Sequence, residues 1–459
     1  MGSPQNRMIG LALAAAMLLT TTRLLAAGHV SLDASHRYYR DAAGHPKFLI
    51  GYYGWAAVPD GYFIDHPSRY AAMMTLGAPY RINYIRISLG VNRMTSRWNG
   101  EGRRTPVPFA YVNGKADLDR WDPVFWTGLR RQCELAHHKG VIVHISLFDG
   151  VELRPQRGAQ FGYSNSFWNP ANQVRQYYPD PDLNHDGGIE QNREFYQLDA
   201  FESSTGLGYY QKKLIDKAMA ETRGDTNVFF EVGNELLSSP STWNTAVIRY
   251  IRSRTHDPVS QCGGGRATNL MGWSQHSANT PAEVKANVAS IVGRGYPAWE
   301  DPDGPALSDL NVSPDDLRRS AWYSFVGGAA CWGGFTVDFW TGGPGFNAVK
   351  AGYYKNLEAF IDQSGVRFWE MAPAQNLVSH SEVNSCLARP GAAYLVYTLD
   401  DATVSLDLTG AAGTMKARSY DPKTGAWGKP LLVTGGGVRT FQKPDAAQDW
   451  VLYVAKANP

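Results

Sequence analysis

A glutamate preceded by an asparagine stands directly after an apolar run near the middle of the chain. The run 228–232 is predicted to be a buried strand, and Asn234 and Glu235 lie just past it. Polar side chains at the carboxyl end of a barrel strand are typical of catalytic residues. A carboxylic acid there can protonate a leaving oxygen and later deprotonate water, while the amide binds a sugar hydroxyl. We predict that Glu235 is the acid/base of glycosidic-bond hydrolysis; the alternative is a glutamate that caps the next helix or pairs with an arginine.

Hydrolysis of this kind needs a second carboxylate. Glu300 stands at the end of a later strand candidate, 296–299, and a helix start with Ser313 as its cap follows. This position predicts Glu300 as the nucleophile. Asp301 and Asp303 are rivals in the same turn, and a solvated acidic turn is the alternative for all three.

Arg86 and His144 lie inside apolar strand candidates, where an ion or an imidazole must have a partner. Because arginine does not lose its charge, we expect Arg86 to lie beside Glu300 and hold that carboxylate ionised. We interpret His144 as a hydrogen-bonded core residue.

Other residues near strand ends are candidates for substrate binding. Polar ones just past a strand can bind sugar hydroxyls, and tryptophans can stack on sugar rings, although core burial is an equally good interpretation of each tryptophan. The full set of substrate-binding candidates is Asn234, Arg86, Trp55, Asp149, Trp168, Asn169, Trp273, His276 and Trp332.

The elements that must position these residues alternate along most of the chain. Short apolar runs and helical patterns follow one another, which is typical of βα units around a parallel sheet. Helices are predicted at 121–139, ended by Gly140, and at 208–223, and a polar and aromatic insertion, 156–198, follows the third strand. We therefore predict an α/β fold, a (β/α)8 TIM barrel. Its strand candidates are 48–51, 84–87, 141–145, 228–232, 269–273, 296–299 and 330–335.

Near Arg389 the spacing of apolar residues changes from the helical period to a period of two. Short runs separated by turns then predict a C-terminal all-β sandwich; they are 394–397, 404–408, 415–418 and 450–454. The predicted domains are a signal peptide at 1–27, a catalytic barrel at 28–380 and a β-sandwich at 381–459.

The first residues are typical of an export signal. Arg7 precedes an apolar stretch, 8–19, and Ala26 and Ala27 precede Gly28. The stretch is too short to span a bilayer, which takes about 20 residues. We expect a soluble protein that is secreted or periplasmic, with no membrane partner after cleavage.

Composition restricts the function only loosely. The 459 residues are 43% hydrophobic and 19% charged, with a formal net charge of +2 and no long run of one sign, so we expect no nucleic-acid partner. Aromatic residues are plentiful, which suits both sugar stacking and a large core. The cysteines form no C-x-x-C pair, which argues against zinc; isolated buried thiols are the favoured interpretation, and any disulfide pairing stays open. They are Cys133, Cys262, Cys331 and Cys386.

The segment 182–190 is similar to the first half of a calcium loop, with acids at alternate positions and then glycine. The twelfth position is Arg193, and Glu194 comes one place late. This departure favours a solvated Asp/Asn turn, and we predict no metal and no cofactor.

These motifs resemble those of bacterial glycoside hydrolases from the large clan that uses two glutamates at the ends of barrel strands 4 and 7. More narrowly, the chain resembles the apiosidase-like family with a "putative collagen-binding" C-terminal domain, a name that does not imply collagen binding here. The resemblance covers nearly the whole mature chain. Its anchors are 37–41 with Gly44 and Pro46, 227–235, Glu300-Asp301 before the helix at 322–328, 389–391 with 394–397, and 407–408 through 450–452.

The resemblance implies a retaining mechanism in which Asn234 and Glu235 match the family's Asn-Glu pair and Glu300 matches its strand-7 acid. The two carboxyls would then lie about 5–5.5 Å apart. Pro302 interrupts the usual acid-acid-glycine turn, so Asp301 and Asp303 stay open as nucleophiles. The expected substrate is a plant or microbial polysaccharide or oligosaccharide, with the sugar, the linkage and the oligomeric state left open.

Two other classes of protein are compatible with parts of the pattern. A non-catalytic carbohydrate-binding protein on a barrel scaffold would keep the aromatic residues but would not need two convergent carboxylates. A polysaccharide lyase or esterase is disfavoured, because the chain contains no G-x-S-x-G elbow.

Overall fold

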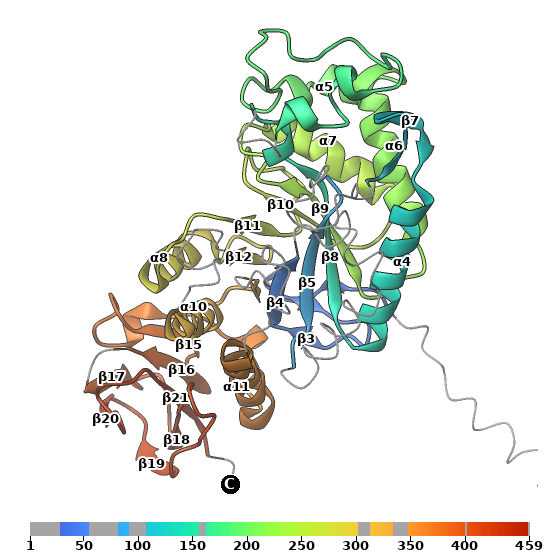
Figure 1. Ribbon diagram of the computed structural model, residues 1–459. Coiled ribbons are helices and arrows are strands. Elements are labelled where there is room, and N and C mark those ends of the chain that lie inside the picture. The colour runs from blue at the N-terminus through green and yellow to red at the C-terminus, as the bar shows by residue number, and fades with distance from the viewer. Residues whose placement is uncertain are drawn as a thin grey trace, which may run out of the picture.

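Eight short strands pair in parallel to form a barrel. The computed structural model describes residues 28–54, 81–90, 107–155, 162–301, 313–333, 348–399 and 402–457. The strand order is β12-β11-β10-β9-β8-β5-β4-β13 (Figure 1), and the amide of Ala330 donates to the carbonyl of Ala298 at 2.9 Å, which links the two edges. The predicted TIM barrel is confirmed. The strands are β4 (Leu49–Gly54), β5 (Tyr84–Ser88), β8 (Ile142–Asp149), β9 (Val228–Asn234), β10 (Val259–Cys262), β11 (Trp273–Gln275), β12 (Ala298–Glu300) and β13 (Cys331–Trp332).

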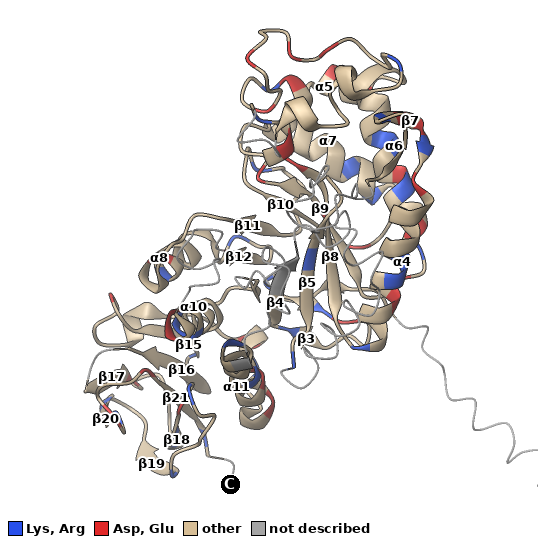
Figure 2. Cartoon of the chain, viewed as in Figure 1, with Lys and Arg blue, Asp and Glu red and all other residues tan. Residues whose placement is uncertain are grey.

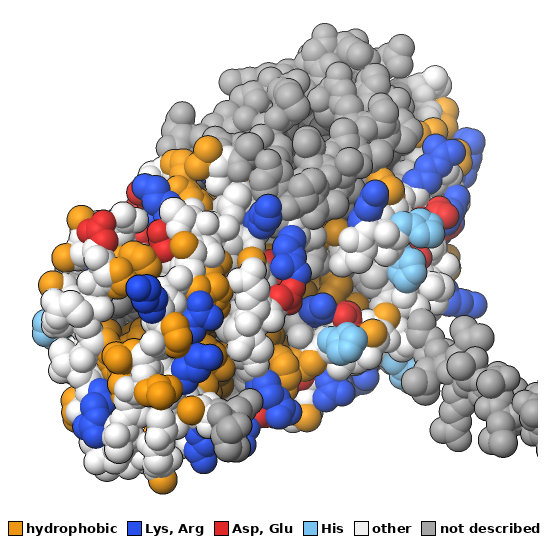
Figure 3. Space-filling model, turned by 90° about the horizontal axis from the view of Figure 1, so that it is seen from below, with side chains coloured by type: hydrophobic (Ala, Val, Ile, Leu, Met, Phe, Trp, Pro, Cys, Tyr) orange, Lys and Arg blue, Asp and Glu red, His pale blue; other side chains and the backbone are white. Residues whose placement is uncertain are grey.

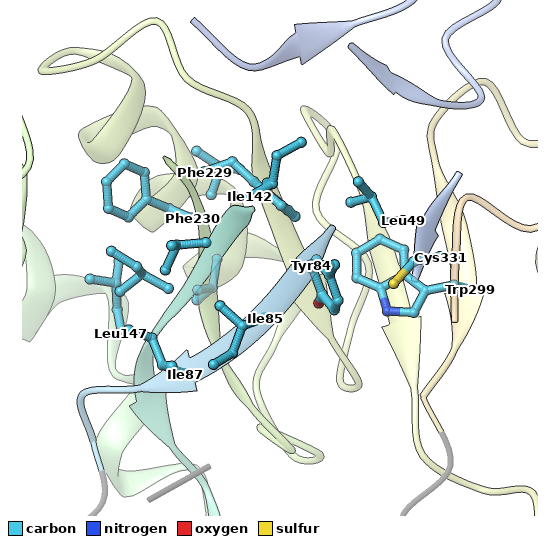
Figure 4. Packing of buried hydrophobic residues seen from close by; sticks show 14 of the residues in the cluster. Leu49, Tyr84, Ile85, Ile87, Ile142, Leu147, Phe229, Phe230, Trp299 and Cys331 are labelled. Atoms are coloured by element: carbon cyan, nitrogen blue, oxygen red, sulfur yellow. The ribbon is translucent and has the colours of Figure 1, made fainter. Parts of the chain in front are cut away.

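The central strands are buried at every position because helices cover the outside of the barrel and side chains fill its interior. Part of the interior is an aromatic layer. The His144 ring stacks on Phe229 with centroids 4.1 Å apart, and Trp299 meets the same imidazole edge-on. Tyr84 lies on the side of β5 that faces Trp299 and Cys331 (Figure 4).

The helices begin and end where capping residues predict. α4 starts after Asp122, whose side chain accepts from the amides of Val124 and Phe125, and Gly140 follows its end with φ of 70°. Its predicted range and that of α6 are both confirmed to within two residues. The α-helices are α4 (Pro123–His138), α5 (Leu198–Glu202), α6 (Gly206–Glu221), α7 (Ser241–Arg252), α8 (Pro281–Ile291), α10 (Pro314–Val326) and α11 (Ala348–Ser364).

Two strands differ from the prediction. β10 was not predicted, because two of its four residues are polar: Ser260 bonds His144 in the interior, and Gln261 donates to the carbonyls of Gly263 and Gly265. The strand expected at 269–273 is displaced, since β11 begins only at Trp273.

Short hairpins and 3-10 turns decorate the barrel. An antiparallel three-stranded sheet opens the described chain, and a hairpin precedes α4. These elements are β1 (Ser31–Leu32), β2 (Tyr39–Arg40), β3 (Pro46–Lys47), β6 (Phe109–Val112), β7 (Lys115–Trp121), η3 (Val151–Leu153), η4 (Tyr163–Asn165), η5 (Pro170–Asn172), η6 (Glu194–Tyr196), η8 (Phe368–Glu370) and η9 (Gln375–Leu377).

The C-terminal domain is built from antiparallel strands, as predicted. A six-stranded sheet, β14-β15-β16-β21-β18-β19, and the pair β17-β20 enclose a hydrophobic cluster that includes Val396, Leu406 and Phe441. The sheet already begins at 372, before the predicted domain start at 381. Its strands are β14 (Ala372–Pro373), β15 (Ser385–Arg389), β16 (Ala393–Thr398), β17 (Thr403–Asp407), β18 (Thr414–Tyr420), β19 (Leu431–Thr434), β20 (Val438–Gln442) and β21 (Trp450–Lys456).

The two domains share a buried contact. α10 and α11 lie between the barrel strands and the C-terminal sheet (Figure 1). Arg318 of α10 forms a two-point ion pair with Asp449, at 2.5 and 3.0 Å, and Tyr397 donates to the same carboxylate. The Trp322 ring lies nearly parallel to that of Tyr397, with centroids 6.2 Å apart.

Outside this contact the surface is mixed. On the face seen in Figure 3, Lys and Arg side chains are scattered among hydrophobic and uncharged ones. None of the helices in the described ranges is long and apolar enough to cross a bilayer. All four cysteines are buried and unbridged. The predicted export signal, Trp55 and Asp303 lie outside the described residues.

The interdomain ion pair should contribute strongly to stability. We expect Asp449→Asn to lower the free energy of unfolding by about 3 kcal/mol, because it leaves the buried Arg318 without its main counter-charge. Asp316→Asn, which removes an exposed partner 3.9 Å from Arg319, should cost less than about 0.5 kcal/mol. Urea denaturation of both variants measures the two losses of unfolding free energy. A loss in Asp449→Asn as small as that in Asp316→Asn would show that the Arg318–Asp449 pair contributes little to stability.

Candidate active site

Arg86 lies at the centre of a polar cluster inside the barrel. It is the basic segment seen within β5 in Figure 2, and its side chain is fully buried. Nη2 donates to Glu231 at 2.5 Å and to the Asn234 amide oxygen at 3.0 Å. Nη1 donates to Asp301 at 3.4 Å and lies 3.2 Å from His276 Nε2. Because a guanidinium carries only donors, the histidine nitrogen is the acceptor of this bond. A single guanidinium thus joins residues from three regions of the sheet.

Glu231 is a member of this cluster that the sequence analysis did not assign. It lies within β9, fully buried, and its second oxygen accepts from Ser274 of β11 at 3.3 Å. The signal that could have revealed it is its charge, since a carboxylate inside an apolar strand needs a cation, and Arg86 is in the same situation.

Asn234 connects the cluster to the end of β8. Its amide nitrogen donates to Asp149 at 3.3 Å, and Ser88 of β5 donates to the same carboxylate oxygen at 3.4 Å. Four of the substrate-binding candidates, Asn234, Asp149, His276 and Arg86, are therefore brought together in the structure. Their proximity follows from the parallel pairing of β5, β8 and β9, which places their carboxyl ends at one edge.

The expected contact between Arg86 and Glu300 is not formed. Glu300 accepts instead from the backbone amides of Ser277 and Ala278, at 2.7 and 2.8 Å, and Asp301 is the acid that reaches Arg86. Side chains alternate between the two faces of a strand. Of the two acids after Trp299, only one can therefore face the barrel interior, and that acid is Asp301. Burial raises the pKa of Glu300, although the two amides oppose this, and a raised pKa does not suit a nucleophile that must be ionised.

Glu235 lies beside this cluster in an unusual conformation. Its φ of 47° falls in the left-handed region, which costs roughly 1–2 kcal/mol for a residue with a Cβ. Its carboxylate pairs with Arg154 at 2.9 Å, and 16% of its side chain is exposed. The Glu235 backbone packs closely against Gly150. Only glycine fits at position 150, because a Cβ there would lie 2.2 Å from the Glu235 carbonyl oxygen.

The described tryptophans that we proposed for sugar stacking are buried. Trp168 lies among Phe148, Phe167 and Phe195, and the Trp332 indole donates to a tyrosine hydroxyl in the core. Trp273 packs in a small hydrophobic cluster under the guanidinium of Arg266. The structure therefore gives these residues a packing role.

Two polar candidates have local structural roles. Asn169 caps a 3-10 turn by accepting from the amide of Ala171, at 2.9 Å. His144 is a hydrogen-bonded core residue, as interpreted: its ring nitrogens lie 2.8 Å from the Tyr84 hydroxyl and 2.7 Å from that of Ser260. Burial lowers the pKa of His144 well below its usual value, with a further contribution from Arg86.

The loop that is similar to a calcium site is held by its own hydrogen bonds. Asp182 accepts from the amides of Asp186 and Gly187, and the side chains of Asn184 and Asn192 both donate to Asp186. Within the described ranges, no three His, Cys, Asp or Glu side chains are gathered as a metal site.

Comparisons with known proteins connect this geometry to a class of folds. Residues 372–455 match the family model described as "Putative collagen-binding domain of a collagenase". No curated protein sequence matches the chain significantly. A solved structure named glycoside hydrolase is similar over 94% of this chain and 97% of its own, with 14% identity and a TM-score of 0.65. A glycoside hydrolase family 5 protein from Bacteroides vulgatus is similar over 93% of each chain, with 15% identity and a TM-score of 0.62. The barrel and the β domain are thus shared as one architecture.

The hydrogen bonds of Glu300 predict a structural role for this residue. Glu300→Ala should lower the free energy of unfolding by about 2 kcal/mol or more, because the buried amide of Ala278 and the partly buried amide of Ser277 lose their acceptor. Glu300→Gln keeps an acceptor oxygen at the same place and should stay close to the wild type. Thermal and urea unfolding measure both, and an Ala variant as stable as the Gln variant would contradict the assignment.

Proposed function

We propose that the protein is a retaining glycoside hydrolase with Glu235 as acid/base and Asp301 as nucleophile. The observation that carries the proposal is one buried network that joins the end of barrel strand 7 to the end of barrel strand 4. Asp301 contacts Arg86, which also holds Asn234, the residue directly before Glu235. The likeness to glycoside hydrolases along the whole chain supports the same conclusion.

The proposed reaction has two steps. The Asp301 carboxylate attacks the anomeric carbon, and the bond to the leaving oxygen breaks as that oxygen takes the proton of Glu235. Glu235 then takes a proton from water, whose oxygen attacks the same carbon and releases Asp301. Arg86 pairs with the Asp301 carboxylate and orients it, and Asn234 binds the sugar hydroxyl beside the bond that breaks. The two carboxyls are expected about 5–5.5 Å apart during this reaction.

The rival proposal is a non-catalytic carbohydrate-binding protein. It predicts exposed aromatic faces, whereas Trp168, Trp273 and Trp332 are buried. It also gives no reason for a buried Arg86 that is shared by a carboxylate and an amide at the strand ends. These two observations favour the enzyme over the binding protein.

We further propose that the protein is exported and acts on a plant or microbial polysaccharide or oligosaccharide. The apolar segment after Arg7 and the small residues before Gly28 support export. A panel of plant and bacterial glycans with product analysis by mass spectrometry tests the substrate class, and mapping of the mature N-terminus tests the signal.

Two isosteric variants should separate the roles of neighbouring acids. We expect Asp301→Asn to abolish hydrolysis, because an amide cannot form the glycosyl-enzyme, and Glu300→Gln to keep activity close to the wild type. Initial rates on the best glycan of the panel measure this. Activity in Asp301→Asn together with its loss in Glu300→Gln would move the nucleophile to Glu300.

Loss of the acid/base Glu235 should have two kinetic consequences, a slower reaction and rescue by azide. Glu235→Gln should lower the rate on an unactivated glycan by about 10²–10⁴-fold while the protein stays folded. Azide, which needs no base to attack, should restore turnover of an activated aryl glycoside by this variant and yield a glycosyl azide. Wild-type rates in the Asp301 and Glu235 variants alike would reject both catalytic assignments, whereas an absence of hydrolysis by the wild type on every glycan of the panel would favour the binding protein.

A further inference from the structure

Arg154 holds Glu235 by two separate groups. Its Nη1 lies 2.9 Å from the Glu235 carboxylate, and its Nη2 donates to the carbonyl oxygen of the same residue at 2.9 Å. Only 11% of the Arg154 side chain is exposed. The planar guanidinium fork thus fixes both the side chain and the main chain of one residue, in a place that is largely shielded from water.

The charge of Arg154 is permanent, and further carboxylates face it. Burial acts to lower the pKa of Arg154, but Glu235, Glu190 and Asp149 together raise it. Glu190 lies 4.0 Å from its Nε and is fixed by the amide of Ser238, which donates at 2.7 Å. The guanidinium therefore stays charged while its effect on Glu235 is partly offset by two other acids.

Two more ionisable groups among the described residues face this cluster. Arg86 of β5 holds Asn234, the residue directly before Glu235. Tyr196 of η6 is buried, and its pKa is raised well above 10 by that burial and by Glu190, so it stays neutral. Arg154 contacts the Glu235 carboxylate directly.

We propose that Arg154 positions Glu235 for proton transfer and sets the upper pH limit of the hydrolase. This inference rests on the proposed function, in which Glu235 must carry a proton when the substrate binds. A cation at this distance favours the ionised form of a carboxyl over the protonated form. The protonated fraction, and with it kcat/KM, then falls at a lower pH than it would without Arg154. The same contact favours the second step, in which Glu235 must be ionised.

The test is the alkaline limb of the kcat/KM profile, measured with the oligosaccharide that the wild type cleaves fastest in the glycan panel. Arg154→Gln removes the cation, so the limb should move to higher pH by about one unit or more. Glu190→Gln removes an opposing carboxylate but keeps an acceptor for Ser238, so the limb should move to lower pH. A purely structural role would not produce shifts of opposite sign.

Two further variants serve as controls. Arg154→Lys restores a cation and should return the limb toward the wild-type position. Arg175→Gln removes an arginine that is paired with Asp119 and 68% exposed, and it should leave the profile unchanged. Circular dichroism establishes that each variant is folded.

The outcomes distinguish this inference from the proposed function. A folded Arg154→Gln whose alkaline limb coincides with that of the wild type overturns the inference. If that variant does not fold, Glu190→Gln decides, and a limb that is unmoved or shifted to higher pH overturns it. Wild-type activity in Glu235→Gln instead overturns the acid/base assignment itself, whatever the Arg154 variants show.

Discussion

Arg86 carries a permanent positive charge at a place that water does not reach, in the second strand of the barrel. Moving an ion from water into a protein interior costs several kcal/mol even after relaxation, unless other groups replace the lost hydration. Glu231, Asn234, Asp301 and His276 provide that replacement from β9, from the end of β12 and from the segment after β11. A single buried charge therefore requires that side chains from distant parts of the chain converge on one point, and the parallel barrel is what allows it.

The polar cluster fills only part of the barrel interior. Next to it, the interior is filled by an aromatic layer in which His144, Phe229 and Trp299 are in ring contact. Replacing a buried ion pair by hydrophobic residues of similar volume is often neutral or favourable, so stability alone is a weak reason for a charge at the level of Arg86. The presence of a charge network where a simpler filling would serve points to chemistry as its reason.

The sequence predicted the barrel and the position of Asn234 and Glu235 at the end of its fourth strand, because long apolar runs, helix caps and polar strand ends are local signals. It could not decide between Glu300 and Asp301. β12 is only three residues long, and tryptophan suits both faces of a barrel strand, so nothing local fixes which residues face inward. The contact of Trp299 with His144 settles the alternation, and that contact joins residues far apart in the chain. Glu231 was missed for a related reason: its partner, Arg86, lies two strands away.

The orientation of Glu235 at the end of β9 does not follow from regular strand geometry. Glu231 and Asn234 are three residues apart and should face opposite sides of a regular strand, yet both bond the same nitrogen of Arg86. Regular alternation has therefore ended before Glu235, which leaves the sheet in the left-handed region.

The register explains what holds this strained residue. Asp149, the last residue of β8, pairs with Asn234, so the residue that follows β8, Gly150, lies against the Glu235 backbone. A few residues further along the same segment, Arg154 binds the Glu235 carbonyl and carboxylate. The segment that follows β8 thus supplies both the space for the turn and the cation that holds it. Strain of this kind persists only where its surroundings over-determine it. Strand 3 therefore fixes the direction of the strand-4 acid as firmly as strand 4 itself does.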